Sequence, residues 1–258
     1  MNEIIAEKLW SVAGPILQKA KGTVGRPEFE ARKAFFGILY VLENGIKWRN
    51  LPAEYGKPTT VHGKFIKWTK EGKMRKVFEE TRKIYMLKTD AFKNWYTADT
   101  SSCKAPYAKC GGKNPTDRSK RGIKKNIAVD SRGAPLAVDI APANQHDSKT
   151  LEQVVNQINT FKQPGLSIVA VDSAYDSKQL QKKLLAQGLV LHSASNKRRN
   201  KKKDIVIPKG RWIVEAVHSW LNNFRALKIC YAKNYESILS FLHIALSALL
   251  FKKILIFG

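Results

Sequence analysis

Apolar residues recur at helical spacing through the first third of the chain. In the segment that starts near Glu28, apolar side chains lie three or four residues apart, and a glycine follows shortly after the last of them. This pattern predicts an amphipathic helix that ends at the glycine. The positions concerned are Phe35, Ile38, Leu39 and Leu42, with Gly45 as the stop.

A second helix is predicted beyond the turn-rich stretch "WRNLPAEYGKP". Val61, Phe65 and Trp68 would form its apolar face, while Lys64 and Lys67 lie elsewhere, and Thr59 or Thr60 could cap its start. Two short helices joined by a turn, the second one basic, suggest a helix-turn-helix-like DNA-binding domain over residues 1–88. A small helical bundle without DNA contacts is the alternative, and Trp48 is expected to pack the module and not to read bases.

The pattern changes near Lys93. The stretch "NWYTADTS" reads as a short strand, two β runs flank residues 131–133 as a hairpin, and residues 166–171 form a nearly continuous apolar strand. Helices are predicted from Asp147 or Ser148 as a cap and before Gly188, with a further strand between Gly188 and the basic loop. We therefore expect an α/β domain over residues 89–258, with a mixed sheet and helices on its faces.

The most apolar stretch, residues 237–251, contains His243 and is short for a membrane span. A buried C-terminal helix is the better interpretation. The N-terminus lacks the basic region of a secretory signal. The chain has three cysteines without a CxxC pair, which fits a reducing compartment.

Charge changes the picture. The chain has 46 Lys and Arg residues against 21 Asp and Glu residues, a formal net charge of +25. Such an excess indicates a polyanionic partner, most often nucleic acid, although a lysine-rich proteome would also produce it.

Two aspartates follow predicted strands and precede small polar residues. Asp99 comes after "WYTA" and Asp172 after "VAV". Ligand sites of α/β sheets lie beyond the carboxyl ends of strands, and two neighbouring carboxylates call for a cation such as Mg²⁺ or Mn²⁺. Hydrogen bonds to turn backbones are the alternative role for either acid. Asp139 and Asp176 compete as candidates, while Asp130 fits the hairpin turn and Asp147 fits a helix cap.

The predicted helix from Arg211 has two faces. Its apolar stripe comprises Ile213, Val217, Trp220, Phe224 and Leu227, and its polar stripe comprises Arg211, Glu215, His218, Asn222 and Arg225. Glu215 could complete a carboxylate metal site for phosphodiester chemistry, or could pair with Arg211 on a solvated face. Periodicity leaves both readings open.

Several ordered blocks resemble a known family. They include "GRPEFEARKAFFGILYVLENGIKWRNLPAEYG", "NPTDRSKRGIKKNIAVDSRGAPLAVDIAPANQHDS", "VDSAYDS" and "RWIVEAVHSWLNNFRAL". Over nearly its whole length the chain resembles bacterial insertion-sequence transposases of the insertion-sequence-5 group, within the DDE class. The resemblance implies an RNase H-like catalytic core with Asp99, Asp172 and Glu215 as the carboxylate triad. Arg211 matches the family's arginine, whereas Pro208 and Asn222 depart from a tyrosine and a lysine found in broader relatives.

The resemblance also implies an activity: cleavage of DNA at insertion-sequence ends and strand transfer into target DNA, with two Mg²⁺ or Mn²⁺ ions per site. The partners would be double-stranded DNA, as terminal inverted repeats and target, and a second protomer when two ends are synapsed, in the bacterial cytoplasm at the nucleoid and not at a membrane. Alternatives are an inactive transposase-derived DNA-binding protein and an RNase H-like nuclease without strand transfer. His218, Asn222 and Arg225 could support the ligands. Expected DNA contacts are Arg211, Lys64, Lys67, Lys113, Arg118, Lys120, Arg121, Lys124, Lys125, Lys197, Arg198, Arg199, Lys201, Lys202 and Lys203.

Overall fold

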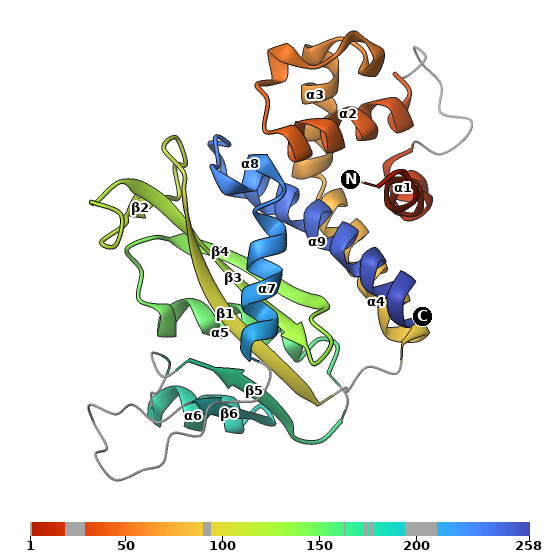
Figure 1. Ribbon diagram of the computed structural model, residues 1–258. Coiled ribbons are helices and arrows are strands. Elements are labelled where there is room, and N and C mark those ends of the chain that lie inside the picture. The colour runs from red at the N-terminus through yellow and green to blue at the C-terminus, as the bar shows by residue number, and fades with distance from the viewer. Residues whose placement is uncertain are drawn as a thin grey trace. The chain divides into compact units, whose positions relative to one another are not determined.

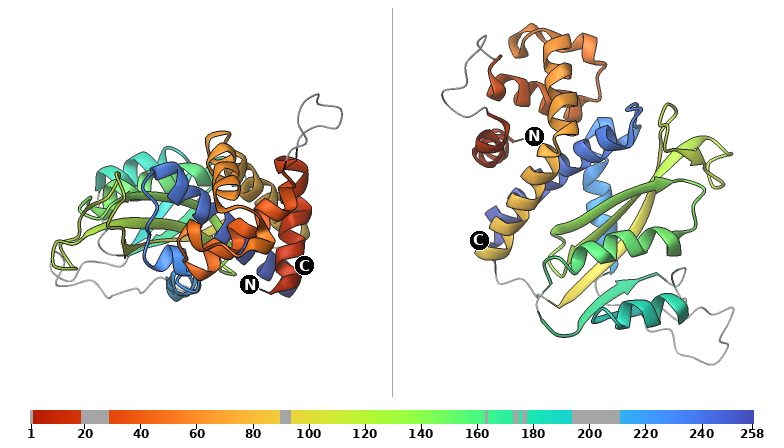
Figure 2. Two further views of the ribbon diagram at one scale, coloured as in Figure 1. Left: turned by 90° about the horizontal axis from the view of Figure 1, so that it is seen from above. Right: turned by 180° about the vertical axis from the view of Figure 1, so that it is seen from behind.

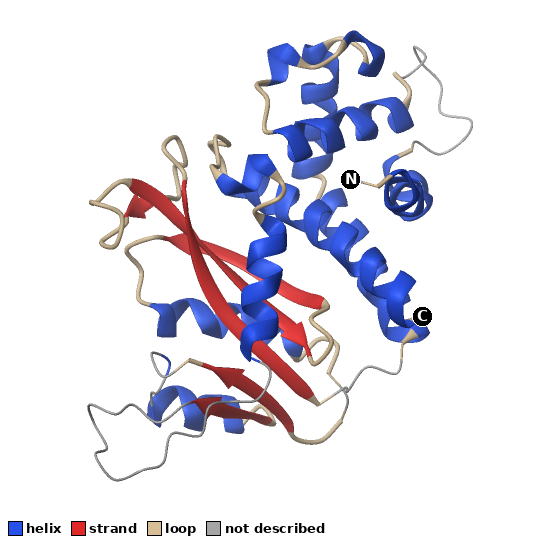
Figure 3. Ribbon diagram, viewed as in Figure 1, coloured by secondary structure: helices blue, strands red, loops and turns tan. Residues whose placement is uncertain are grey.

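The computed structural model describes residues 2–18, 29–89, 94–162, 164–172, 175, 178–193 and 211–258. The chain divides into two compact units. The helical unit combines Met1–Thr89 with Leu221–Gly258, and the sheet unit comprises Asp90–Trp220. All strands that the structure describes belong to the sheet unit, as the colouring by secondary structure shows (Figure 3).

The helical unit confirms the first predicted helix. Its elements are α1 (Glu3–Leu17), α2 (Ala31–Asn44), α3 (Pro58–Lys70), α4 (Lys73–Lys88), α8 (Arg225–Lys228) and α9 (Tyr235–Phe257), with short 3₁₀ turns at Trp48–Asn50 and Ala53–Tyr55. The predicted apolar face of α2 is buried. Gly45 ends the helix at φ 64°, and its N–H donates to the Val41 carbonyl at 2.9 Å. Glycine adopts this left-handed conformation without steric cost, which explains the stop.

Helix α3 buries Val61, Phe65 and Trp68, as predicted. The predicted threonine cap is wrong, because the helix begins at Pro58 and no side chain caps it. Proline at the first helical position has its φ already set for a helix and lacks an N–H that would be unsatisfied there. Trp48 packs its ring 5.4 Å from Phe65 and 6.2 Å from Phe241, which confirms its packing role.

Helix α9 is apolar on all sides and runs alongside α4 (Figures 1 and 2). By length and composition it is the one helix within the described residues that could cross a membrane, yet 83% of its most apolar window is buried inside the protein. This confirms the predicted buried C-terminal helix. Burial lowers the pKa of His243 to about 3, so the imidazole is neutral where it stacks on Phe78.

The position of α9 corrects the predicted domain boundaries. We expected residues 89–258 to form one domain, but residues 221–258 belong to the helical unit. The apolar surface of α9 is covered there by α1 and α4, so a segment distant in sequence completes that unit's core.

The sheet unit has a mixed sheet in the order β2-β3-β1-β5-β6, and β4 also pairs with β3. Strand β3 is antiparallel to β1 and β4, whereas β5 is parallel to β1 and β6 is parallel to β5. The longer strands therefore follow the order β4-β3-β1-β5-β6, which confirms the predicted α/β fold with a mixed sheet. The strands are β1 (Trp95–Lys104), β2 (Gly112–Lys113), β3 (Arg121–Asp130), β4 (Pro135–Pro142), β5 (Ser167–Val171) and β6 (Leu189–Ser193).

Strands β3 and β4 confirm the predicted hairpin. Asp130 accepts hydrogen bonds at 2.9 Å from the backbone N–H groups of Arg132 and Ala134, and Gly133 adopts φ 73° between them. Asp130 is therefore a turn residue, as the sequence indicated.

Helices cover both faces of the sheet. Helix α5 (Asp147–Ile158) lies on one face and α7 (Arg211–Leu221) on the other, with α6 (Lys178–Leu185) near β6 (Figures 1 and 2). The buried stripe of α7 comprises Val214, Val217, His218 and Leu221. This corrects the predicted stripe: Ile213 is only half-buried and Trp220 is 37% exposed. The helix ends at Leu221, so Phe224 and Leu227 do not continue its face.

Candidate active site

Asp99 lies in the middle of β1 and not at a strand end, which corrects the sequence-based placement. The strand continues to Lys104 because β3 pairs with it along its whole length, up to Lys104 opposite Gly122. On the other side the parallel partner β5 stops, and the last pair in register is Thr97 with Ala170. Asp99 therefore stands just beyond the point at which β1 loses one of its two neighbours.

Asp172 follows β5 directly, because the strand ends at Val171. Each aspartate follows its residue of the Thr97–Ala170 pair by two positions, Asp99 within β1 and Asp172 just beyond the end of β5. Neighbouring strands lie about 4.8 Å apart, so the two carboxylates start from adjacent backbone positions. Oxygen ligands arranged in this way suit a Mg²⁺ or Mn²⁺ ion.

Glu215 is exposed near the start of α7, one turn before His218. Among the residues that the structure describes, no three His, Cys, Asp or Glu side chains lie close enough to hold one metal ion. Asp99 and Asp172 thus lie equally far beyond the last pair of β1 and β5, and the structure does not gather Glu215 with them into a group that could hold a metal ion. Three carboxylates repel one another until a cation neutralises them, which is a physical reason for the wider spacing.

His218 is a buried neighbour of Asp99, not a helix-surface residue. Its Nε2 lies 3.4 Å from the Asp99 carbonyl oxygen and 3.9 Å from Oδ2. Burial lowers the pKa of His218 to about 4, with a further lowering by the charge of Lys125 and an opposing effect of the hydrogen bond to Asp99. The imidazole is therefore neutral at neutral pH and makes no ion pair with the carboxylate.

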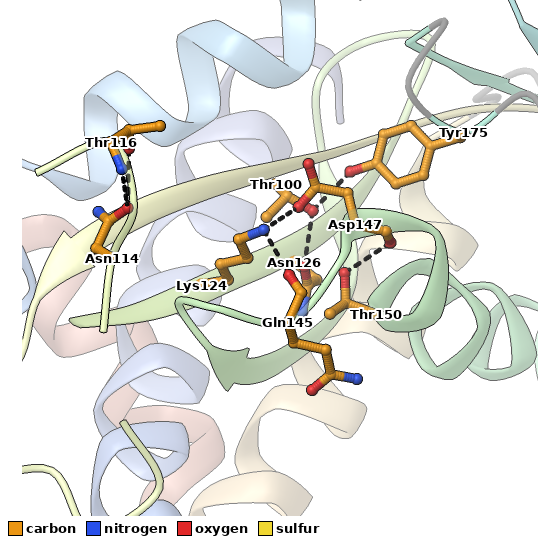
Figure 4. Close-up of polar contacts among 9 residues, drawn as sticks. All are labelled: Thr100, Asn114, Thr116, Lys124, Asn126, Gln145, Asp147, Thr150 and Tyr175. Carbon is orange, nitrogen blue, oxygen red and sulfur yellow. Dashed lines mark hydrogen bonds and ion pairs between the residues drawn. The ribbon is translucent and has the colours of Figure 1, made fainter. Parts of the chain in front are cut away.

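A partly buried hydrogen-bonded chain links the two aspartate-bearing segments (Figure 4). The Thr100 hydroxyl donates to Asn126 Oδ1 at 2.7 Å and lies 2.7 Å from the Tyr175 hydroxyl. Tyr175 is 2% exposed, and its backbone N–H donates to the Asp172 carbonyl at 3.0 Å. Burial above all raises the pKa of Tyr175, with smaller contributions from Asp147, Asp99 and Asp172, against a lowering by Thr100.

The structure corrects two of the predicted DNA contacts. Lys124 donates to the Gln145 carbonyl at 2.7 Å and pairs with Asp147 Oδ1 at 2.5 Å (Figure 4). Asp147 is the first residue of α5, and its carboxylate binds Lys124. Lys125 is 1% exposed, since β3 directs it into the core. Lys125 is therefore not presented to a DNA backbone, whereas Lys124 is half-buried and already paired.

The other basic candidates differ in availability. Arg118, Lys120 and Lys67 are exposed, and Lys67 lies 3.9 Å from Glu71. Lys64 is half-buried over the Trp68 ring, and the Arg121 guanidinium donates to the Ala108 and Lys109 carbonyls. Asn222 and Arg225 are exposed, but in the helical unit and beyond the end of α7. Several candidates lie outside the described residues, as does the side chain of Arg211. They are Lys197, Arg198, Arg199, Lys201, Lys202, Lys203, Pro208 and the competing acid Asp176.

Sequence reasoning missed Tyr175 and Thr100 as neighbours of the aspartates, and it placed Lys125 on the surface. Tyr175 follows Asp172 by three residues and Thr100 follows Asp99 directly, so proximity in sequence was the available signal. Lys125 gave a contrary signal, because it stands within a run of basic residues that resembles a solvated segment.

Comparisons with known proteins agree on one family. Residues 63–251 match the family described as "Transposase DDE domain", and residues 5–78 match a family of candidate transposases of the IS4/5 type. A candidate transposase for insertion sequence element IS402 of Burkholderia cepacia is 32% identical over 133 residues, which is 48% of this chain and 61% of that protein. A 16.2 kDa protein of the same element is 42% identical over 57 residues, which is 20% of this chain and 39% of that protein. The match therefore spans less than two thirds of either relative.

Solved structures give a weaker likeness. A synaptic complex of piggyBac transposase with hairpin DNA is 12% identical, with a TM-score of 0.44, and the match covers 98% of this chain and 73% of that one. A pre-cleavage Mos1 transpososome is 12% identical, with a TM-score of 0.28, over 93% of this chain and 81% of that one. At these scores the likeness carries no argument about function. The family match covers most of the chain and includes the strands and helix that carry Asp99, Asp172 and Glu215, so this chain belongs to the transposase DDE-domain family.

Proposed function

We propose that this protein is a DNA transposase that cleaves DNA at the ends of an insertion sequence and joins the freed ends to target DNA. The observation that carries the proposal is the placement of Asp99 and Asp172, each two residues beyond the last pair in register of the parallel strands β1 and β5, in a chain of the transposase DDE-domain family. Asp99, Asp172 and Glu215 are the proposed ligands of divalent metal ions. Two ions per site, Mg²⁺ or Mn²⁺, are part of the proposal.

The residues fit such ions in donor type and in position. Carboxylate oxygens are the ligands that hard divalent cations prefer, and Asp99 retains 20% side-chain exposure toward solvent. Bound cations would activate a water or a DNA 3′-hydroxyl and stabilise the leaving oxygen of a phosphodiester. Glu215, exposed on α7, would be drawn toward the aspartates by the added positive charge.

His218 would hold Asp99 in place without competing for it. Because burial keeps the imidazole neutral, it adds no positive charge that would repel a cation from the carboxylate. If Nε2 donates to the Asp99 carbonyl, the ring connects α7 to β1 at Asp99, the residue whose carboxylate is the proposed metal ligand. His218 is thus a positioning residue in this proposal and not a general base.

Exposed basic residues would bind the DNA backbone. Phosphate contacts supply affinity that falls steeply with salt, while sequence choice is assigned to the helix-turn-helix-like module through Lys64 and Lys67. The segment 197–203 and Arg211 remain part of the proposed DNA interface. Synapsis of two ends by a homodimer, and an association with the nucleoid in the bacterial cytoplasm, belong to the same proposal.

Two neighbouring lysines provide a test of the DNA surface. Lys120→Met is expected to reduce the slope of log DNA affinity against log salt concentration by up to about one, because Lys120 is exposed. Lys125→Met is expected to leave that dependence unchanged, because Lys125 is 1% exposed. Affinity measured for one duplex between low and moderate salt gives both slopes. Equal reductions for the two variants would contradict the burial argument.

The activity itself is tested with the full chain and a duplex that carries the terminal sequence found beside its gene. We expect strand cleavage that requires Mg²⁺ or Mn²⁺, and joining of a pre-cut end to a second duplex. Binding without metal-dependent cutting would favour the inactive DNA-binding protein. Cutting without joining would favour an RNase H-like nuclease.

A further inference from the structure

The hydrogen-bonded chain of Tyr175, Thr100 and Asn126 lies where the backbone ladder between β1 and β5 has ended. The last backbone pair in register joins Thr97 to Ala170, and Asp99 and Asp172 both stand beyond it. From that point the strands are free to separate. Two carboxylates on neighbouring segments repel each other, so the separation would be favoured electrostatically.

Side chains close this gap. Tyr175 is tied to Asp172 through its backbone N–H, and its hydroxyl reaches Thr100, the residue after Asp99. Because side chains alternate along β1, Thr100 points to the face opposite Asp99. The link therefore joins the two segments on the sheet face opposite the Asp99 carboxylate, and it leaves the face that carries this carboxylate free for a ligand.

The direction of the protons is set by chemistry. A threonine hydroxyl has one proton, and Thr100 gives it to Asn126 Oδ1, which can only accept. Tyr175 must then donate to Thr100 Oγ1. Asn126 lies on β3 in register with Thr100, so the chain is anchored to a strand that pairs with β1 on its other side. Tyr175 and Asn126 are both 2% exposed, while Thr100, which joins them, is half-buried.

We propose that Tyr175, Thr100 and Asn126 form a clamp that sets the spacing of Asp99 and Asp172 and thereby the affinity of this site for divalent metal ions. The clamp rests on the proposed metal-dependent function. Tyr175 is a positioning residue, because it acts through the aspartates and does not touch the ion. Ligand-orienting partners of this kind commonly change metal affinity by about 10- to 100-fold.

The test compares full-length wild type with Tyr175→Phe and Thr100→Val, which each remove one hydroxyl, and with Thr100→Ser, which keeps it. The measurement is the Mg²⁺ or Mn²⁺ concentration that half-saturates the protein without DNA, obtained by fitting the rise of the unfolding temperature with the logarithm of metal concentration. We expect Tyr175→Phe and Thr100→Val to raise this concentration about tenfold. Thr100→Ser should stay within about twofold of wild type, and the double variant should be no worse than either single one, because both break the same chain.

Tyr96→Phe is the matched control, because Tyr96 is also a 2% exposed tyrosine in the same sheet. It should lower the unfolding temperature without changing the half-saturating metal concentration. If Tyr175→Phe and Thr100→Val keep the wild-type concentration, or if Tyr96→Phe shifts it equally, the clamp is overturned while the proposed function stands. If wild type itself shows no response to either metal, the proposed function fails and the clamp fails with it.

Discussion

Asp99→Asn, Asp172→Asn and Glu215→Gln are each expected to lower the rate of DNA cleavage about a thousandfold, which corresponds to about 4 kcal/mol of transition-state stabilisation. Each change keeps the size of the side chain and removes the negative charge that would bind a cation. DNA affinity should persist or rise slightly, because a repulsive charge near the phosphates is lost. Single-turnover cleavage at saturating protein, with binding measured in parallel, separates the two effects.

Two acids of the same unit serve as controls. Asp117→Asn and Glu152→Gln remove the same charge at positions paired with Lys104 and Lys183 respectively, so cleavage should stay within about twofold of wild type for surface pairs of this kind. The Glu215 variant is the most informative of the three triad changes, because the two aspartates follow neighbouring paired strands whereas the structure does not gather Glu215 with them. Full activity of Glu215→Gln would remove it from the ligand set while leaving the aspartate pair intact.

Leu246→Asp is expected to unfold the helical unit or to lower its stability by about 4 kcal/mol or more, a large part of the 5–15 kcal/mol typical of a domain. Leu246 is fully buried in α9, so the variant loses a leucine's burial and places a carboxylate in an apolar interior. Thermal unfolding followed by circular dichroism, together with the fluorescence of buried Trp68, would report the loss.

Leu255→Asp is the matched control on the same helix, because Leu255 is 50% exposed. Its carboxylate can remain in water, so the unfolding temperature should change little. Similar stability of the two variants would contradict the assignment of α9 to the core of the helical unit.

Local sequence patterns predicted most of the helices and strands. Apolar residues spaced three and four apart predicted α2 and α3, a continuous apolar run predicted β5, and turn residues predicted the hairpin around Gly133. These features depend on neighbours a few residues away, which the chain itself displays. The extent of β1 was misjudged, because the residues after Asp99 are polar and are kept in a strand by β3, which lies more than twenty residues later.

In the candidate site, too, some residues could be predicted from the sequence and others only from the structure. Asp99, Asp172 and Glu215 were identified by their residue types, their local settings and a family resemblance, whereas the clamp of Tyr175, Thr100 and Asn126 depends on strand pairing. A hydrogen bond between residues 75 positions apart leaves no periodic trace in a sequence. The burial of His218 likewise depends on where α7 ends and on how it is rotated over the sheet.

By itself, the sequence determined that this protein has a helical first part, an α/β part with a mixed sheet, a strongly basic surface and three acids suited to metal-dependent DNA chemistry. Short-range hydrophobic periodicity and charge composition are sufficient for the first three conclusions, whereas the three acids were singled out by their local settings and by a family resemblance. Tertiary structure alone decided that α9 completes the helical unit, that Lys125 is buried, and that Asp99 and Asp172 both follow the last pair of two neighbouring parallel strands. Each of these depends on which distant segment covers an apolar surface or pairs with a strand edge, and burial free energy summed over the whole chain makes that choice.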